Sequence, residues 1–102
     1  MEIKNYTLSE EIASKAKAIY FPGAEGETEQ LQFQDRNDER PNPLIVYTVK
    51  GIPNSHVQVT LNPMMPLIEH IDLMGEESDM EKIIAAVDKD FGIELASADP
   101  RP

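Results

Sequence analysis

Cysteine is absent from the 102 residues of this chain. The protein therefore has no disulfide, no thiolate nucleophile and no thiolate ligand for a structural zinc ion, which favours a reducing compartment. Long apolar runs are absent too, because none reaches the roughly 18 residues that a membrane-spanning helix needs. The first residues lack the basic and apolar regions of a secretory signal. We therefore expect a cytoplasmic protein that does not enter a membrane.

Basic residues are scarce. The chain has nine Lys and Arg against 19 Asp and Glu, a formal net charge of −10. Residues 61–102 hold ten of the acids and three of the bases, so this part carries a net charge of −7. Nucleic acids and anionic membranes are bound through Lys and Arg, so we expect neither as a direct partner. An acidic surface instead favours association with a basic protein.

Catalytic and ligand-binding motifs are also missing. The sequence has no G-x-S-x-G nucleophile turn, no phosphate-binding glycine loop and no EF-hand spacing of carboxylates. The two histidines, His56 and His70, are fourteen residues apart and match no metal-binding motif. We therefore predict a protein that is not an enzyme and has no cofactor and no metal site. A ligand-binding protein or metal-dependent enzyme that uses these histidines with loop carboxylates is a second alternative.

The clearest structural pattern is a β-hairpin over residues 44–61. Its first arm, LIVYTV, is dense in β-branched and aromatic residues, and its second, HVQVTL, alternates apolar and polar positions. Gly51, Pro53 and Asn54 between the arms are typical turn residues. A short strand at 31–34 precedes the hairpin, and a polar loop at 35–43 joins them. We expect three antiparallel strands in one small sheet.

Two helices are predicted around this sheet. Residues 7–20 show helical spacing of apolar residues after a capping box formed by Thr7 and Glu10. A second amphipathic helix begins with the pair Ser78 and Glu81 and ends at Gly92, a residue suited to the left-handed position after a helix. The segment 67–74 fits either a short helix or an edge strand, and we favour the helix.

The expected fold is therefore α+β: an N-terminal helix, a small three-stranded antiparallel sheet, and a C-terminal amphipathic helix packed on one face. Residues 1–95 should form a single compact domain, followed by a flexible C-terminal tail at 96–102. The free edge of such a sheet could pair between two copies, which leaves a homodimer open. The segment 79–95 is similar to the last helix of acyl carrier proteins, which ends in a similar FGI turn. The Asp-Ser-Leu attachment site of that family is absent, and a β-hairpin departs from its all-helical fold, so no function follows from this similarity.

The main candidate for a binding surface is a group of carboxylates within 26 residues of the second half. Its members are Glu69, Asp72, Glu76, Glu77, Asp79, Glu81, Asp88, Asp90 and Glu94. Closely spaced carboxylates could imitate the phosphates of a nucleic acid and occupy the basic groove of a nucleic-acid-binding protein. The ordinary interpretation is a solvated acidic face that keeps a small domain soluble. Our leading hypothesis is a small inhibitor or antagonist of a basic, nucleic-acid-handling protein, of the kind found in phage and bacterial conflict.

The adjacent residues Met64 and Met65, set between two prolines, are a second candidate surface, since thioether side chains adapt to apolar partners. The corresponding alternative is an immunity, antitoxin-like or adaptor protein that binds through an apolar Met64–Met74 surface. Salt distinguishes the two hypotheses, because binding driven by charge weakens as ionic strength rises and apolar binding does not.

Overall fold

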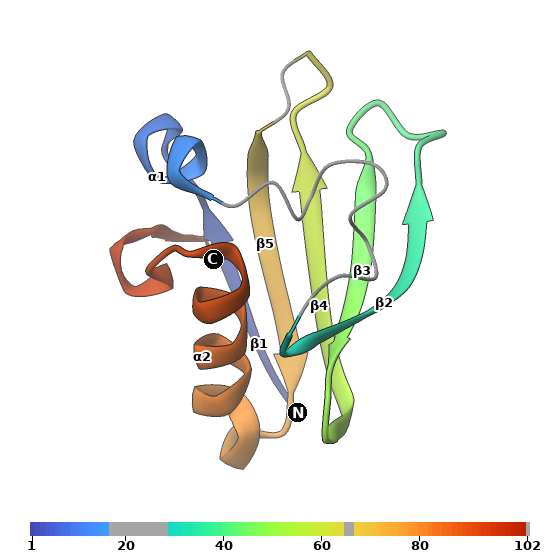
Figure 1. Ribbon diagram of the computed structural model, residues 1–102, viewed down its shortest axis with the longest axis vertical. Helices are drawn as coiled ribbons and strands as arrows, with labels where there is room; N and C mark the ends of the chain where they lie inside the picture. Colours follow the sequence, from blue (N-terminus) through green and yellow to red (C-terminus); the bar gives the residue numbers. More distant parts are fainter. Residues whose placement is uncertain (17–28, 65–66, 102) are drawn as a thin grey trace.

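The computed structural model describes residues 1–16, 29–64 and 67–101 of the chain (Figure 1). The described residues contain a six-stranded antiparallel sheet with the order β2-β3-β4-β5-β1-β6. The strands are β1 (Glu2–Thr7), β2 (Leu31–Asn37), β3 (Leu44–Val49), β4 (Ile52–Leu61), β5 (Ile68–Gly75) and β6 (Asp99–Arg101). The helices are α1 (Glu10–Lys15) and α2 (Met80–Phe91), with 3₁₀ turns η2 (Glu77–Asp79) and η3 (Leu95–Ser97).

The predicted hairpin is present as β3 and β4. Ile45 pairs with Val59 and Tyr47 with Val57, and all four side chains are fully buried on the same face of the sheet. Gly51 lies in the turn with a φ of 85°, a left-handed conformation that glycine adopts without a steric penalty. The alternation of apolar residues therefore predicted the pairing of the two arms, whereas Pro53 and Asn54, which we predicted as turn residues, lie in β4.

The prediction of a three-stranded sheet is wrong, because the sheet has six strands, although the α+β class holds. Part of the error lies at 67–74, where β5 replaces the short helix that we favoured. Ile68, Ile71 and Leu73 of β5 are buried against the core. The pairing of β4 with β5 shifts between Thr60 and Leu61, so Ile68 and Ile71 face the same side although they are three residues apart. That shift in register imitates helical spacing in the sequence.

The N-terminal region also differs from the prediction. Residues 2–7 form β1, which pairs with β5 from Glu2 opposite Gly75 to Thr7 opposite His70. Helix α1 therefore starts later than Thr7. Its N-cap is Ser9, whose Oγ accepts the backbone N–H of Ile12 at 3.2 Å. The predicted capping box at Thr7 is wrong, and residues 17–20 of the predicted helix lie outside the described residues.

Helix α2 carries the apolar stripe that the sequence predicts. Met80, Ile83, Val87 and Phe91 are buried, and Gly92 follows in the left-handed conformation with a φ of 69°. Ser78 does not cap this helix, because it lies in η2, and Asp79 precedes α2 without a side-chain capping bond. The segment 96–102, where the sequence indicates a flexible tail, includes β6, which pairs with β1.

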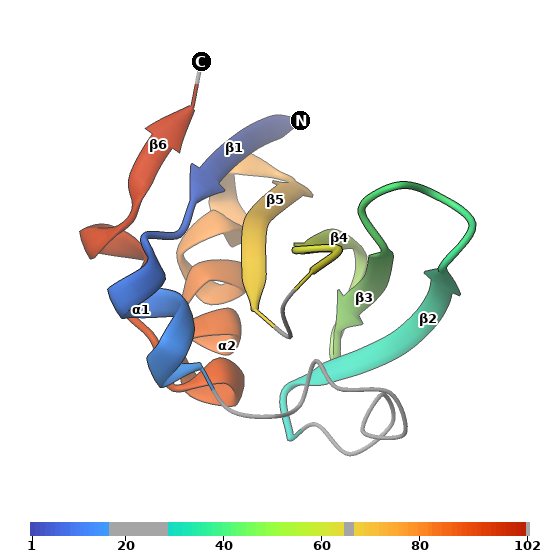
Figure 2. The same ribbon diagram turned by 90° about the horizontal axis from the view of Figure 1, so that it is seen from above.

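Both helices lie on the same side of a curved sheet, which Figure 2 shows from above. The core fills the space between α2 and this side of the sheet. There the rings of Tyr47 and Phe91 pack edge to face, with their centroids 6.1 Å apart. Neither described helix covers the opposite side, which we call the outer face. Its side chains on the inner strands are Ile3, Asn5 and Thr7 of β1, Leu44, Val46 and Thr48 of β3, His56, Gln58 and Thr60 of β4, and His70, Asp72 and Met74 of β5.

Candidate functional site

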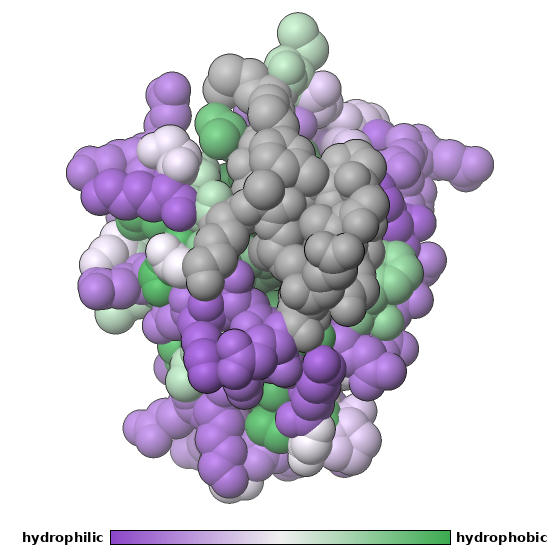
Figure 3. Space-filling view, in the orientation of Figure 1, coloured by the Kyte–Doolittle hydropathy of each residue, from purple (hydrophilic) through white to green (hydrophobic). Residues whose placement is uncertain are grey.

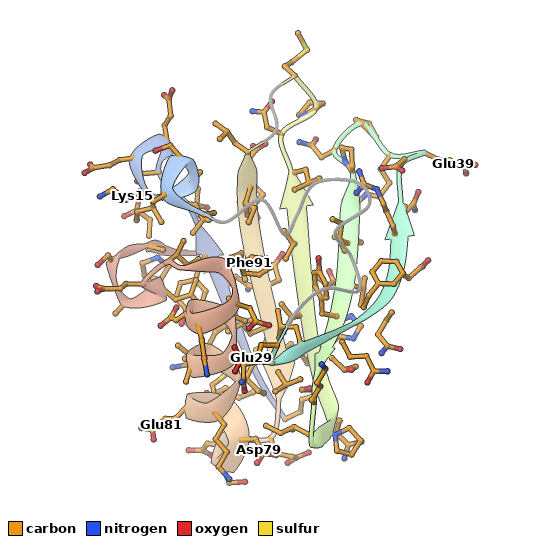
Figure 4. The ribbon with its side chains drawn as sticks, viewed as in Figure 1. Lys15, Glu29, Glu39, Asp79, Glu81 and Phe91 are labelled. Carbon is orange, nitrogen blue, oxygen red and sulfur yellow. The ribbon has the colours of Figure 1, made fainter. Side chains whose placement is uncertain are left out.

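Among the described residues, four carboxylates lie within six positions where β5 turns into α2. Glu76, Glu77 and Glu81 are exposed and Asp79 is half-buried. These four residues are called the acidic end, and Figure 4 shows Asp79 and Glu81 close together at one end of the molecule. Among the described residues, no ion pair joins any of the four to a basic side chain. The lower part of the surface in Figure 3 is accordingly mostly hydrophilic.

A buried glycine immediately precedes the acidic end. Gly75 is buried at the end of β5, and a Cβ atom at this position would lie 2.5 Å from Cδ1 of Ile83. Because real Cβ atoms do not approach that closely, any larger residue at position 75 would require the end of the Ile83 side chain to move. Only residues 76–79 connect β5 to α2, and three of the four carboxylates of the acidic end lie in this connection.

The other predicted carboxylates are distributed over separate places. Glu69 accepts a hydrogen bond from Nδ2 of Asn42 at 3.2 Å, and Asp72 lies half-buried on the outer face. Asp90 is buried, with 7% of its surface exposed. The structure therefore does not bring the predicted carboxylates of the second half into one continuous array.

Asp90 has a structural role. Its Oδ2 accepts the backbone N–H groups of Gln30 at 2.9 Å and Leu31 at 2.8 Å, and its Oδ1 lies 3.1 Å from the N atom of Gln30. The carbonyl of Gln30 in turn accepts the N–H of Lys50. Asp90 therefore joins α2 to the start of β2 and is turned away from solvent.

The predicted methionine surface is divided as well. Met64 is 88% exposed in the connection between β4 and β5, and Met65 lies outside the described residues. Within the segment Met64–Met74, the buried residues of β5 belong to the core. Met74 lies on the outer face opposite Ile3, which is 58% exposed. Among the described residues of the segment, Met64 is therefore the only exposed large apolar side chain, and it lies apart from the exposed Ile3 on β1.

The two histidines lie on the outer face in different surroundings. Nδ1 of His70 is 3.2 Å from Oγ1 of Thr7, and Nε2 of His56 is 2.9 Å from Nε2 of Gln58. Their positions along β4 and β5 differ, because His56 pairs with Met74 and His70 pairs with Thr60. No group of three or more histidine or carboxylate residues within the described parts of the chain could hold a metal ion.

A groove of about 540 Å³ lies between α1 and the C-terminal end of α2. We call it the α1–α2 groove, and its described lining consists of Ile12, Lys15, Asp88, Gly92, Ile93, Glu94 and Ser97. Burial raises the pKa of Asp88; a hydrogen bond from the N–H of Leu95 opposes this rise, and the charge of Glu94 adds to it. The sequence did not indicate this site, because its walls are distant in the chain and no spacing signals that α1 packs beside the end of α2.

No protein-family model matches the chain, and comparisons with curated proteins and with solved structures found no match. In the part of the chain that the structure describes, every helix is too short or too polar to span a bilayer. The function must therefore be argued from the surfaces described above.

Proposed function

We propose that this protein is a non-catalytic binding module that engages a basic protein partner through its acidic end. The observation that supports the proposal is the group formed by Glu76, Glu77, Asp79 and Glu81. Four carboxylates lie within six residues at one end of the molecule and have no basic partner among the described residues. A surface with such a charge attracts a basic partner and accelerates the encounter.

The partner that we propose is a protein whose basic surface ordinarily contacts nucleic acid. Closely spaced carboxylates present negative charge to Lys and Arg side chains as a phosphate backbone does. A protein bound to that surface excludes the nucleic acid, so inhibition follows from occupancy alone. This version of the hypothesis needs only the acidic end, and it does not require the buried Asp90.

Affinity capture from host lysate at about 50 mM and about 300 mM salt tests the proposal, since screening changes severalfold over this range. The first bait is the unchanged protein, and the second carries Glu76→Lys and Glu77→Lys. Neither residue lies within α2, so the helix should remain intact. Reversing two exposed charges should reduce retention of a basic partner by about fivefold or more at low salt, from ~0.2–1 kcal/mol per exposed charge pair.

A matched control bait carries Asp35→Lys and Glu39→Lys. Both residues are exposed, the net charge changes by the same amount, and Figure 4 shows Glu39 at the opposite end of the molecule from Asp79. The control should retain the partner. Capture of no basic protein, or equal loss with both variants, would contradict the proposal. A captured partner that still binds its nucleic acid in the presence of excess protein would contradict the inhibitory role.

The second candidate is an adaptor that binds an apolar partner through the outer face. The specific observation is the exposed Ile3 beside Met74 on a side of the sheet that neither described helix covers. Binding through this surface should resist salt, in contrast to binding through the acidic end. Ile3→Asp should abolish a salt-resistant capture and leave a salt-sensitive one unchanged.

A further inference from the structure

The α1–α2 groove has the size and the wall chemistry of a small-molecule site. Its volume of about 540 Å³ is within the range of roughly 300–1,000 Å³ that ligand pockets occupy. Ile12 and Ile93 supply apolar walls, and a few polar groups are available to orient a ligand: Asp88, Glu94, Ser97 and Lys15. The groove lies away from the acidic end, at the opposite end of α2.

Asp88 is held in a fixed orientation inside this groove. Its Oδ1 accepts the N–H of Leu95 at 2.9 Å. The backbone carbonyl oxygen of Asp88 accepts the N–H groups of Gly92 at 2.9 Å and Ile93 at 3.2 Å. No hydrogen bond from the described residues reaches Oδ2, which is not among their fully buried unsatisfied atoms. The groove therefore contains a positioned carboxylate oxygen that is accessible to a ligand.

The local charge favours a cation. Burial raises the pKa of Asp88 and repulsion by Glu94 adds to this rise, so two carboxylates act on the same space. The C-terminal end of α2 adds the partial negative charge of its backbone dipoles. Lys15 is the only basic residue in the described lining. Its Nζ lies 3.7 Å from Oε1 of Glu11, a residue that is not part of the described lining. Burial disfavours the charge of Asp88, and a bound cation would offset that cost.

We propose that the α1–α2 groove binds a primary ammonium group carried on a short apolar chain. The ammonium donates hydrogen bonds to Oδ2 of Asp88 and is attracted by Glu94, while the chain lies against Ile12 and Ile93. A free small amine and a lysine side chain share this chemistry. The site is independent of the acidic end, so either proposal can fail without the other.

The test is a titration of the ¹⁵N-labelled protein with n-butylammonium chloride at constant ionic strength, followed by amide chemical shifts in NMR spectra. We expect saturable shifts at Ile12, Gly92, Ile93 and Ser97. Neutral n-butanol at the same concentrations should not reproduce them. Loss of a charge-assisted hydrogen bond, ~1.5–3 kcal/mol, corresponds to a weakening of about tenfold or more for the variant Asp88→Asn.

The matched control is Asp35→Asn, which removes one exposed carboxylate on β2 and should bind like the unchanged protein. Asparagine at position 88 can still accept the Leu95 N–H, so the fold should survive. If the spectrum shows otherwise, Glu94→Gln replaces it, because Glu94 is exposed, and should weaken binding severalfold. Absence of saturable shifts, equal shifts with n-butanol, or equal binding by the groove variant and Asp35→Asn would overturn the proposal.

Nα-acetyl-lysine amide, which keeps its side-chain ammonium group, distinguishes the two sources of the ammonium group. It carries the same four-carbon ammonium chain as n-butylammonium but adds a peptide backbone. Tighter binding of the lysine compound than of n-butylammonium assigns the groove to a lysine of a peptide or protein. Weaker binding assigns it to a free amine, because the backbone is then excluded by the walls. Whichever compound binds more tightly, the result supports an ammonium site if Asp88→Asn weakens the binding of both compounds.

Discussion

Replacing Asp90 by alanine should strongly destabilise the fold, although the residue belongs to a highly acidic segment. The carboxylate accepts the backbone N–H groups of Gln30 and Leu31 at distances of 2.8–3.1 Å. Gln30 immediately precedes β2, and Leu31 is the first residue of this strand. The carbonyl oxygen of Gln30 also accepts a hydrogen bond from the N–H of Lys50. One side chain therefore fixes the edge of the sheet to α2, and its removal affects both elements.

The magnitude follows from these two donors. A hydrogen bond to a charged group contributes ~1.5–3 kcal/mol to the free energy of unfolding. Leu31 is fully buried, so loss of this acceptor should incur the upper part of that range, whereas the half-buried Gln30 can turn its N–H to water. The sum is about 3–4 kcal/mol for Asp90→Ala. That is a large fraction of the ~5–15 kcal/mol that stabilises a typical domain. Asp90→Asn keeps one acceptor oxygen and should lose about half as much.

Urea unfolding followed by circular dichroism measures this effect, with the slope m compared between variants to verify that the unfolded states are equivalent. Asp35→Ala is the control, since Asp35 is exposed on β2, and should stay within about 0.5 kcal/mol of the unchanged protein. A decrease of less than about 1 kcal/mol in the free energy of unfolding for Asp90→Ala, with m unchanged, would refute the structural role of Asp90.

Gly75, Asp88 and Ser9 each allow a test of one local feature. Gly75→Ala should destabilise by about 1–3 kcal/mol through overpacking against Ile83. In a urea-unfolding double-mutant cycle Ile83→Val, which removes the clashing Cδ1, should recover part of that loss, whereas additive losses would contradict the close packing. Burial and Glu94 raise the pKa of Asp88, so the folded state binds more protons than the unfolded state between the ordinary and the raised value. The stability from this group is complete below that window and is lost as the pH rises through it. Asp88→Asn should remove this slope from the pH dependence of the melting temperature, and a slope equal to that of the unchanged protein would contradict the assignment. Ser9→Ala removes the N-cap of α1 and should cost ~0.5–2 kcal/mol, or several degrees in melting temperature, and an unchanged melting temperature would show that the cap contributes nothing.

Sequence reasoning succeeded where the structure is determined by neighbouring residues. The hairpin β3–β4 depends on alternation and on a two-residue turn formed by Lys50 and Gly51, and α2 depends on an apolar stripe followed by Gly92. Sequence reasoning failed where a strand pairs with another strand that is distant in the sequence. In β1 the apolar residues Ile3 and Tyr6 face opposite sides of the sheet, so the strand has no alternating pattern. Its place in the sheet is determined by β5, which lies more than sixty residues further along the chain.

The acidic segment shows the same limit for function. A count of carboxylates treats Asp88, Asp90 and Glu94 as equivalent. Asp88 is half-buried in the α1–α2 groove, Asp90 is buried against backbone amides, and Glu94 is an exposed residue of the groove lining. These differences arise from α1 and from the residues before β2, which are distant in the sequence. At the turn after β5 the chain leaves the sheet and no described basic side chain pairs with its carboxylates, so Glu76 and Glu77 remain as exposed as the sequence indicates. The salt dependence of partner binding should therefore correspond to about four contacting charges, because the other carboxylates of the second half attract a partner only from a distance.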